Sequence, residues 1–131
     1  MGLDVHVYRV RKDHVTKDFQ VIEDQEVWDD LGYYSEGGTM EKPSIEDLFW
    51  WGYEGRHILY WLQDTFPKKE DMNGAYIRLD KPLLKSFKKF VLPSIEKESV
   101  GRQEAKNFVS YAKKFFDEKD NDYELFICAD W

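Results

Sequence analysis

The sequence predicts one α+β domain spanning residues 1–131, in which a small, mainly antiparallel sheet is covered by three to four helices. Three observations support this prediction. The length of 131 residues suits a single domain. Apolar residues alternate as in strands near both chain ends, and they recur at helical spacing in the second half. Strands and helices do not alternate regularly, which favours α+β over a parallel α/β sheet.

The first strand is predicted at residues 3–10, LDVHVYRV, where apolar and polar residues alternate. Its polar face carries Asp4, His6 and Tyr8. FQVI at 19–22 predicts a short second strand, which we expect to form a hairpin with the first. Residues 23–40 show no clear periodicity, and their Gly pair and polar residues are typical of a surface loop.

Two helices are predicted in the middle of the chain. The segment 45–51, IEDLFWW, follows Pro-Ser and carries acidic residues where a first helical turn favours them, so we expect a short helix there. Gly52 and Gly55 should interrupt it. A second helix is predicted from Arg56 to Phe66, because its apolar residues form one stripe and a proline follows at once.

The C-terminal half predicts strand, helix, helix and strand. AYIRL at 75–79 is strand-like, and Asp80 is a good N-cap for a helix that ends near Pro93. A longer amphipathic helix should reach about Glu118. The last segment, 123–131, is apolar on both faces, which predicts a central strand. Because terminal apolar strands commonly pair, we expect the first and last strands to be neighbours.

Composition narrows the possible functions. The 26 acidic and 19 basic residues give a formal charge of −7, which opposes direct binding to a nucleic-acid backbone and suits solubility or a basic protein partner. A single cysteine, Cys128, excludes an internal disulfide. With neither a leader-like start nor an apolar stretch of membrane-spanning length, we expect a cytoplasmic protein that does not contact membranes.

WWGYEGRH at 50–57 is the stretch with the most specific chemistry. Its glycines permit close backbone approach, its aromatics can form pocket walls, and its Arg can clamp an anion with a neighbouring Glu or His. The same residue types also build structural corners by stacking and ion pairing. The candidate ligand- or partner-binding residues here and on the following helix are Trp51, Tyr53, Glu54, Arg56, His57 and Trp61.

A second candidate cluster lies on the terminal strands. Asp4 and His6 share one strand face, Cys128 and Asp130 share another, and pairing of the strands would bring all four together. Such a set can bind a divalent metal or perform acid–base chemistry. The alternative is structural: a turn-capping Asp, a hydrogen-bonded His and a small core Cys. The spacing matches no metal or catalytic signature, so we expect no metal, no cofactor and no assigned catalytic residue.

Four blocks of the sequence resemble a family of small uncharacterised bacteriophage and prophage proteins. These blocks are MGLDVHVY, GYEGRHILYWLQDTF, GAYIRLDKPLLKSF and YELFICADW. They are similar to the family's MGLD start, central Tyr-x-(Arg/Lys)…Ile-x-x-Trp helix, strand before a Leu-rich helix, and closing strand ending in Ser-Trp. This chain departs from the pattern with Ala-Asp-Trp at its end and Gly-Arg-His before the helix. The resemblance implies phage origin and expression in a bacterial host, with no established activity.

Three functional hypotheses follow. The first is a non-enzymatic phage accessory protein that binds a host or phage macromolecule, most readily a protein, to counter defence or modulate the host. The alternative is a small enzyme or ligand-binding protein that uses a pocket of Asp4, His6, Arg56 and His57. The third is an acidic nucleic-acid mimic that uses the clusters IEDQEVWDD and DEKDNDYE. The sequence leaves the oligomeric state open.

Overall fold

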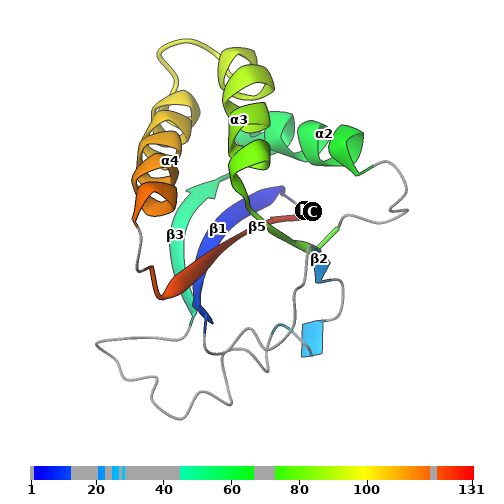
Figure 1. Cartoon of the computed structure of the whole chain (residues 1–131). Helices are drawn as coiled ribbons and strands as arrows, with labels where there is room; N and C mark the ends of the chain where they lie inside the picture. The colour runs from blue at the N-terminus through cyan, green and yellow to red at the C-terminus, as the bar shows by residue number, and fades with distance from the viewer. Residues whose placement is uncertain are drawn as a thin grey trace.

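The computed structural model describes residues 2–12, 21–22, 25–26, 28, 45–66, 73–118 and 121–131. These residues form five strands, three α-helices and short 3₁₀ turns (Figure 1). The strands are β1 (Asp4–Arg11), β2 (Val21–Ile22), β3 (Ile45–Trp51), β4 (Tyr76–Arg78) and β5 (Tyr123–Asp130). The helical elements are η2 (Tyr53–Gly55), α2 (Arg56–Thr65), α3 (Lys81–Phe90), η3 (Leu92–Ser94) and α4 (Val100–Asp117).

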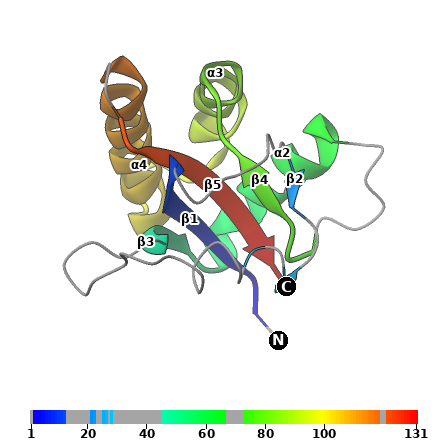
Figure 2. The ribbon, with the colours of Figure 1, turned by 60° about the horizontal axis from the view of Figure 1, so that its bottom comes forward.

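The strands form one antiparallel sheet in the order β2-β4-β5-β1-β3, which can be followed in Figure 2. The first and last strands are hydrogen-bonded neighbours, as the sequence predicts. Asp4 lies opposite Asp130, and His6 lies opposite Cys128. β5 occupies the centre of the sheet, which agrees with its apolar residues on both faces. The α+β prediction is therefore confirmed.

The three helices lie on one side of the sheet, and the main core fills the space between the two layers (Figure 2). Val5 and Val7 of β1 point into this core with the neighbouring residues of β5. Above them, Phe87 of α3 and Phe108 of α4 meet edge to face, with ring centroids 4.9 Å apart. Aromatic rings therefore contribute a large part of this core.

A second, smaller core covers the opposite face of the sheet. Trp28 stacks on Tyr76 with ring centroids 3.9 Å apart and meets the edge of Phe126. The same cluster contains the buried residues Val10, Ile22 and Cys128. Alternation along β5 therefore supplies apolar side chains to both cores.

The helix boundaries follow the signals in the sequence. The Asp80 carboxylate accepts a hydrogen bond from the Leu83 amide at 2.8 Å and starts α3. Ser99 performs the same function for α4 by accepting from the Arg102 amide at 3.1 Å. The predicted span of α2 is also confirmed, since it begins at Arg56 after a glycine.

Two local predictions are wrong. The segment 45–51 is strand β3 and not a helix, because its alternating large side chains pair with β1 along the sheet. Its acidic residues serve that pairing: Glu46 accepts from the Arg9 side chain at 2.7 Å instead of stabilising a helix end. The predicted β1–β2 hairpin does not form either. β2 pairs with β4 at one edge of the sheet, and β4 and β5 lie between β2 and β1.

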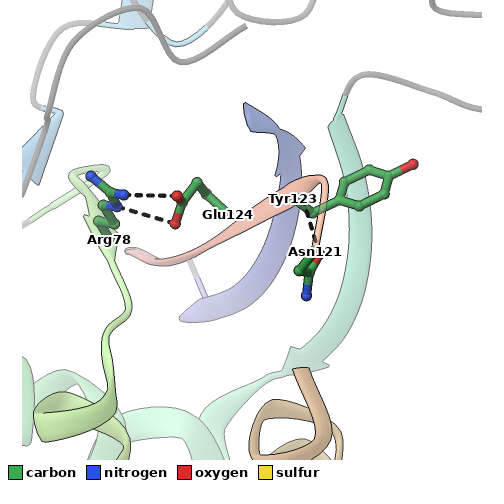
Figure 3. Close-up of polar contacts among 4 residues, drawn as sticks. All are labelled: Arg78, Asn121, Tyr123 and Glu124. Atoms are coloured by element: carbon green, nitrogen blue, oxygen red, sulfur yellow. Dashed lines mark hydrogen bonds and ion pairs between the residues drawn. The ribbon is translucent and has the colours of Figure 1, made fainter. Parts of the chain in front are cut away.

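The start of β5 is fixed by two sets of polar contacts (Figure 3). Arg78 of β4 grips Glu124 with two hydrogen bonds, at 2.7 and 3.2 Å. Asn121 accepts from the Tyr123 amide at 3.0 Å and donates to the Phe115 carbonyl of α4. Tyr123 and Glu124 point to opposite sides of the strand, as alternation requires.

Candidate functional site

The segment 50–57 joins β3 to α2 and divides its two tryptophans between opposite sides of the sheet. Trp51 is buried, with 2% of its surface exposed, and its indole Nε1 donates to the Gly101 carbonyl at 3.0 Å. Trp50 is 54% exposed, and its Nε1 donates to the Asp4 carboxylate at 2.9 Å. One residue of this pair therefore anchors the turn in the core, and the other is presented to solvent.

Glu54 ties the same turn to the N-terminus of α4. Its carboxylate accepts a hydrogen bond from the Gly101 amide, one of the donors that the first helical turn leaves unpaired. The negative charge also meets the positive end of the helix dipole. Together with the Trp51 indole, this contact forms what we call the α4 clasp, defined as Trp51, Glu54 and Gly101. Glu54 is thus a structural residue.

Two glycines allow the clasp to close. A Cβ on Gly55 would lie 2.8 Å from Val5 Cγ2 and 2.9 Å from Trp51 Cβ. A Cβ on Gly101 would lie 2.7 Å from Glu54 Cβ. All three distances are shorter than van der Waals contact. Gly55 thus brings the backbone close to its neighbours, as the sequence predicts for the stretch 50–57, and Gly101 does the same at the start of α4. The buried half of the segment is therefore a structural corner, which is the second of the two interpretations that the sequence allows.

The outer half of the turn forms an exposed apolar surface, the Trp50 patch, defined as Trp50, Gly52, Tyr53 and Val100. Tyr53 is 75% exposed and Val100 is 83% exposed. Together with the α4 clasp and Glu104, these residues line an open hollow of about 610 Å³. Large apolar side chains grouped in this way are typical of an interaction surface.

The side chains of the patch are held by neighbours. The Arg56 guanidinium lies 4.3 Å from the centre of the Tyr53 ring and donates to the Tyr53 carbonyl at 3.3 Å. Asp4 holds Trp50 from the first strand. Arg56 therefore supports an aromatic ring, whereas the sequence suggested that it binds an anion.

The predicted pocket of Asp4, His6, Arg56 and His57 does not form. His6 lies on the sheet face opposite the helices, because it alternates with the core residue Val5. Its Nδ1 is 2.8 Å from the Asp47 carboxylate. His57 belongs to α2, which covers the other face. Opposite faces of the sheet thus separate the two imidazoles, and the geometry does not support the enzyme hypothesis in that form.

The terminal-strand cluster offers no metal cage among the described residues, where no group of three or more His, Cys, Asp and Glu side chains is placed to hold an ion. Cys128 is buried, and burial together with the nearby Asp130 raises the pKa of its thiol to about 12. Because the thiolate is the reactive form, this cysteine is a core residue and not a nucleophile.

The raised pKa of Cys128 predicts a loss of stability in alkaline solution. The folded chain holds the thiol proton up to a pKa of about 12, whereas an unperturbed thiol titrates near 9.0, so unfolding is favoured increasingly above that lower value. Burial likewise raises the pKa of Tyr8, with a smaller contribution from Asp47. Chemical denaturation at about pH 8 and about pH 11 should show a smaller alkaline loss for Cys128→Ala than for the wild type. Equal losses would contradict the assignment.

The remaining candidate residues, His57 and Trp61, line a groove between α2 and α3 with a volume of about 510 Å³. Trp61 is buried, and its indole Nε1 donates to the Ser86 hydroxyl at 2.9 Å. The other residues that line the groove are Tyr60, Asp64, Thr65, Ser86, Phe90 and Ser94. A smaller hollow of about 160 Å³, lined by Tyr53, Glu54, Arg56, His57, Ile95 and Glu96, lies between the groove and the Trp50 patch. Shared residues make the three hollows one continuous surface.

Several residues of this surface are missing from the sequence prediction. The predicted helix at 45–51 does not place Trp50 and Trp51 on opposite faces, so the sequence gives no reason to single out Trp50. A strand assignment would have exposed one of them. Val100 and Phe90 come from distant helices, and only the tertiary fold brings them to the surface formed by residues 50–61. Most of the acidic cluster IEDQEVWDD lies outside the described residues, as do two residues of DEKDNDYE.

No helix in the described part of the chain combines the length and the apolar character needed to cross a bilayer. Comparisons with known protein families, with curated proteins and with solved structures find no match to this chain.

Proposed function

We propose that this chain is a non-catalytic binding protein whose Trp50 patch docks on a basic surface of a partner protein. The observation that supports the proposal best is the rigid presentation of Trp50 and Tyr53. Both rings are largely exposed, yet Asp4 and Arg56 hold them in place. Aromatic side chains that are ordered before binding lose little entropy on docking, and such residues dominate the energetics of protein interfaces.

The charge around the patch favours a basic partner. The described residues that line its hollow include Glu54 and Glu104 and no Lys or Arg. Arg56 lies over the Tyr53 ring and is not among the residues that line the hollow. The whole chain carries a formal charge of −7, which adds a long-range attraction to positive surfaces. The preferred partner surface combines an apolar pocket with Lys or Arg at its rim.

The biological setting of the proposal comes from the resemblance to phage and prophage proteins. In that setting the chain acts in the cytoplasm of a bacterial host, and its partner is a host or phage protein, with counter-defence or host modulation as the outcome. Direct catalysis is not part of the proposal, since the residues first suspected of it are separated by the sheet.

The test is capture of partners from a bacterial lysate on the immobilised protein, at salt concentrations of about 0.05 M and about 1 M, because salt screens charge attraction. We expect a specific protein with a basic surface to be retained by the wild type at low salt and released at high salt. The double variant Trp50→Ala/Tyr53→Ala should not retain it.

Three results would contradict the proposal. The first is recovery of no specific partner at either salt concentration. The second is a partner that the double variant retains as well as the wild type. The third is a retained partner that is acidic, or one whose binding is insensitive to salt.

A further inference from the structure

We propose that the groove between α2 and α3 is a binding site for a cationic side chain, an Arg or Lys, donated by the same partner. The inference rests on the proposed function only for the source of the cation. The preference of the groove for positive charge is a property of the chain itself and is tested below with small probes.

Aromatic side chains supply the walls of the site. Tyr60 is 54% exposed and Phe90 is 58% exposed, and both line the groove. Trp61 contributes a ring of fixed orientation. Its indole Nε1 donates a hydrogen bond to the Ser86 hydroxyl, and its ring meets Phe87 edge to face with centroids 5.5 Å apart. Exposed rings on two neighbouring helices offer the electron-rich faces that attract ammonium and guanidinium groups.

The charges in the groove select the sign of the ligand. Asp64 is the one carboxylate in the described lining, and no Lys or Arg belongs to that lining. Partial burial and the adjacent Arg56 lower the pKa of His57, against an opposing effect of Glu96, so the imidazole is neutral at pH 7. An anion would be repelled by Asp64, and a metal ion would find a single carboxylate. A cation with an extended, partly apolar stem fits this combination best.

Phe90 already receives a cation from within the chain. The Lys89 ammonium lies 5.3 Å from the centre of the Phe90 ring, at the solvent side of α3. The contact shows that the ring is open to a positive group. It also makes Lys89 a competitor, so its removal should strengthen binding of an external cation.

The groove and the Trp50 patch suit one partner. His57 lines both the groove and the smaller hollow, and Tyr53 lines both that hollow and the hollow of the patch. A partner that places an apolar residue on the patch therefore runs along a continuous surface toward the groove. A basic residue of the same segment is then positioned to meet Asp64.

The experiment titrates the full chain with N-acetyl-arginine amide, with the neutral isostere N-acetyl-citrulline amide as control. Side-chain NMR signals of Tyr60, Phe90 and the Trp61 indole report on occupancy. We expect saturable shifts with the arginine probe and at least threefold weaker binding of the citrulline probe, the range expected for a cation over aromatic rings. Equal binding of both probes would overturn the inference.

Substitutions locate the site. Asp64→Asn and Phe90→Ala should each lower the affinity for the arginine probe about threefold to tenfold. Lys89→Ala should raise this affinity. Asp117 is an exposed carboxylate on α4 outside the groove, so Asp117→Asn should leave the affinity unchanged. Unchanged binding in Asp64→Asn, or equal weakening in Asp117→Asn, would overturn the assignment.

Two further readouts separate this inference from the proposed function. Trp50→Ala should leave binding of the arginine probe unchanged while it weakens binding of the partner, so one proposal can be contradicted without the other. Because the pKa of His57 is lowered, its imidazole gains a proton only in solution more acidic than an ordinary histidine requires; the added positive charge beside the site should then weaken binding of the arginine probe. The nearby charged groups are Arg56, Glu96 and Asp64, and His57→Gln should remove the effect of acidification that belongs to His57. A probe affinity that stays constant on acidification would contradict the role of His57.

Discussion

Replacing Trp51 by alanine should lower the free energy of unfolding by about 3–5 kcal/mol, the usual cost of removing a large buried ring. Trp51 is almost fully buried and packs on Phe108 and Phe49. It also donates to the Gly101 carbonyl, so its loss opens the α4 clasp as well as the core. Urea denaturation followed by far-UV circular dichroism measures the effect, since it does not depend on tryptophan fluorescence.

Two variants control this prediction. Trp51→Phe keeps part of the ring packing and loses the N–H donor, so it should be destabilised less than Trp51→Ala. Trp50→Ala removes the neighbouring, exposed ring and should change stability by no more than about 1 kcal/mol. If the two alanine variants were equally stable, the division of the tryptophans between core and surface would be wrong.

The sequence was most informative where structure depends on neighbouring residues. The N-cap at Asp80, the glycine before α2 and the apolar spacing of α4 each locate a helix through contacts within a few residues. The pairing of the terminal strands was also predictable, because β5 is apolar on both faces and needs neighbours on both edges. These signals sufficed for the fold class.

The prediction of a helix at 45–51 is wrong because residues distant in sequence determine the structure of this segment. Glu46 and Asp47 are consistent with a helix start in isolation, but Arg9 and His6 on β1 bind them and favour a strand. The length of the segment gives no help, since seven residues suit either element. Tertiary pairing thus overrode a local signal.

The candidate site shows the same limit. The composition of WWGYEGRH marks the segment as unusual, yet the partners that explain it lie more than forty residues away in sequence. They are Gly101 for Trp51 and Glu54, and Asp4 for Trp50. Alternation along a strand would have separated Trp50 from Trp51 if β3 had been predicted. No local signal could have revealed that Val100 completes the patch.

The largest functional effect should come from the exposed tryptophan. Trp50→Ala should weaken binding of the captured partner by about 2 kcal/mol or more, roughly thirtyfold, the range of an interface hot spot. Tyr53→Ala should have a similar but smaller effect, because tyrosine presents a smaller ring than tryptophan. Both side chains are more than half exposed, so little stability should be lost with them.

Isothermal titration of the purified partner measures the loss, with Trp50→Phe as the conservative variant and Lys113→Ala, an exposed α4 residue outside the patch hollow, as the surface control. Trp50→Phe keeps an aromatic ring but loses the bond to Asp4, and it should lie between wild type and alanine. The order wild type, Phe, Ala would show that a positioned ring drives binding. Wild-type affinity in both Trp50→Ala and Tyr53→Ala would place the interface elsewhere on the molecule, because a docked patch cannot lose its two largest rings without weakening.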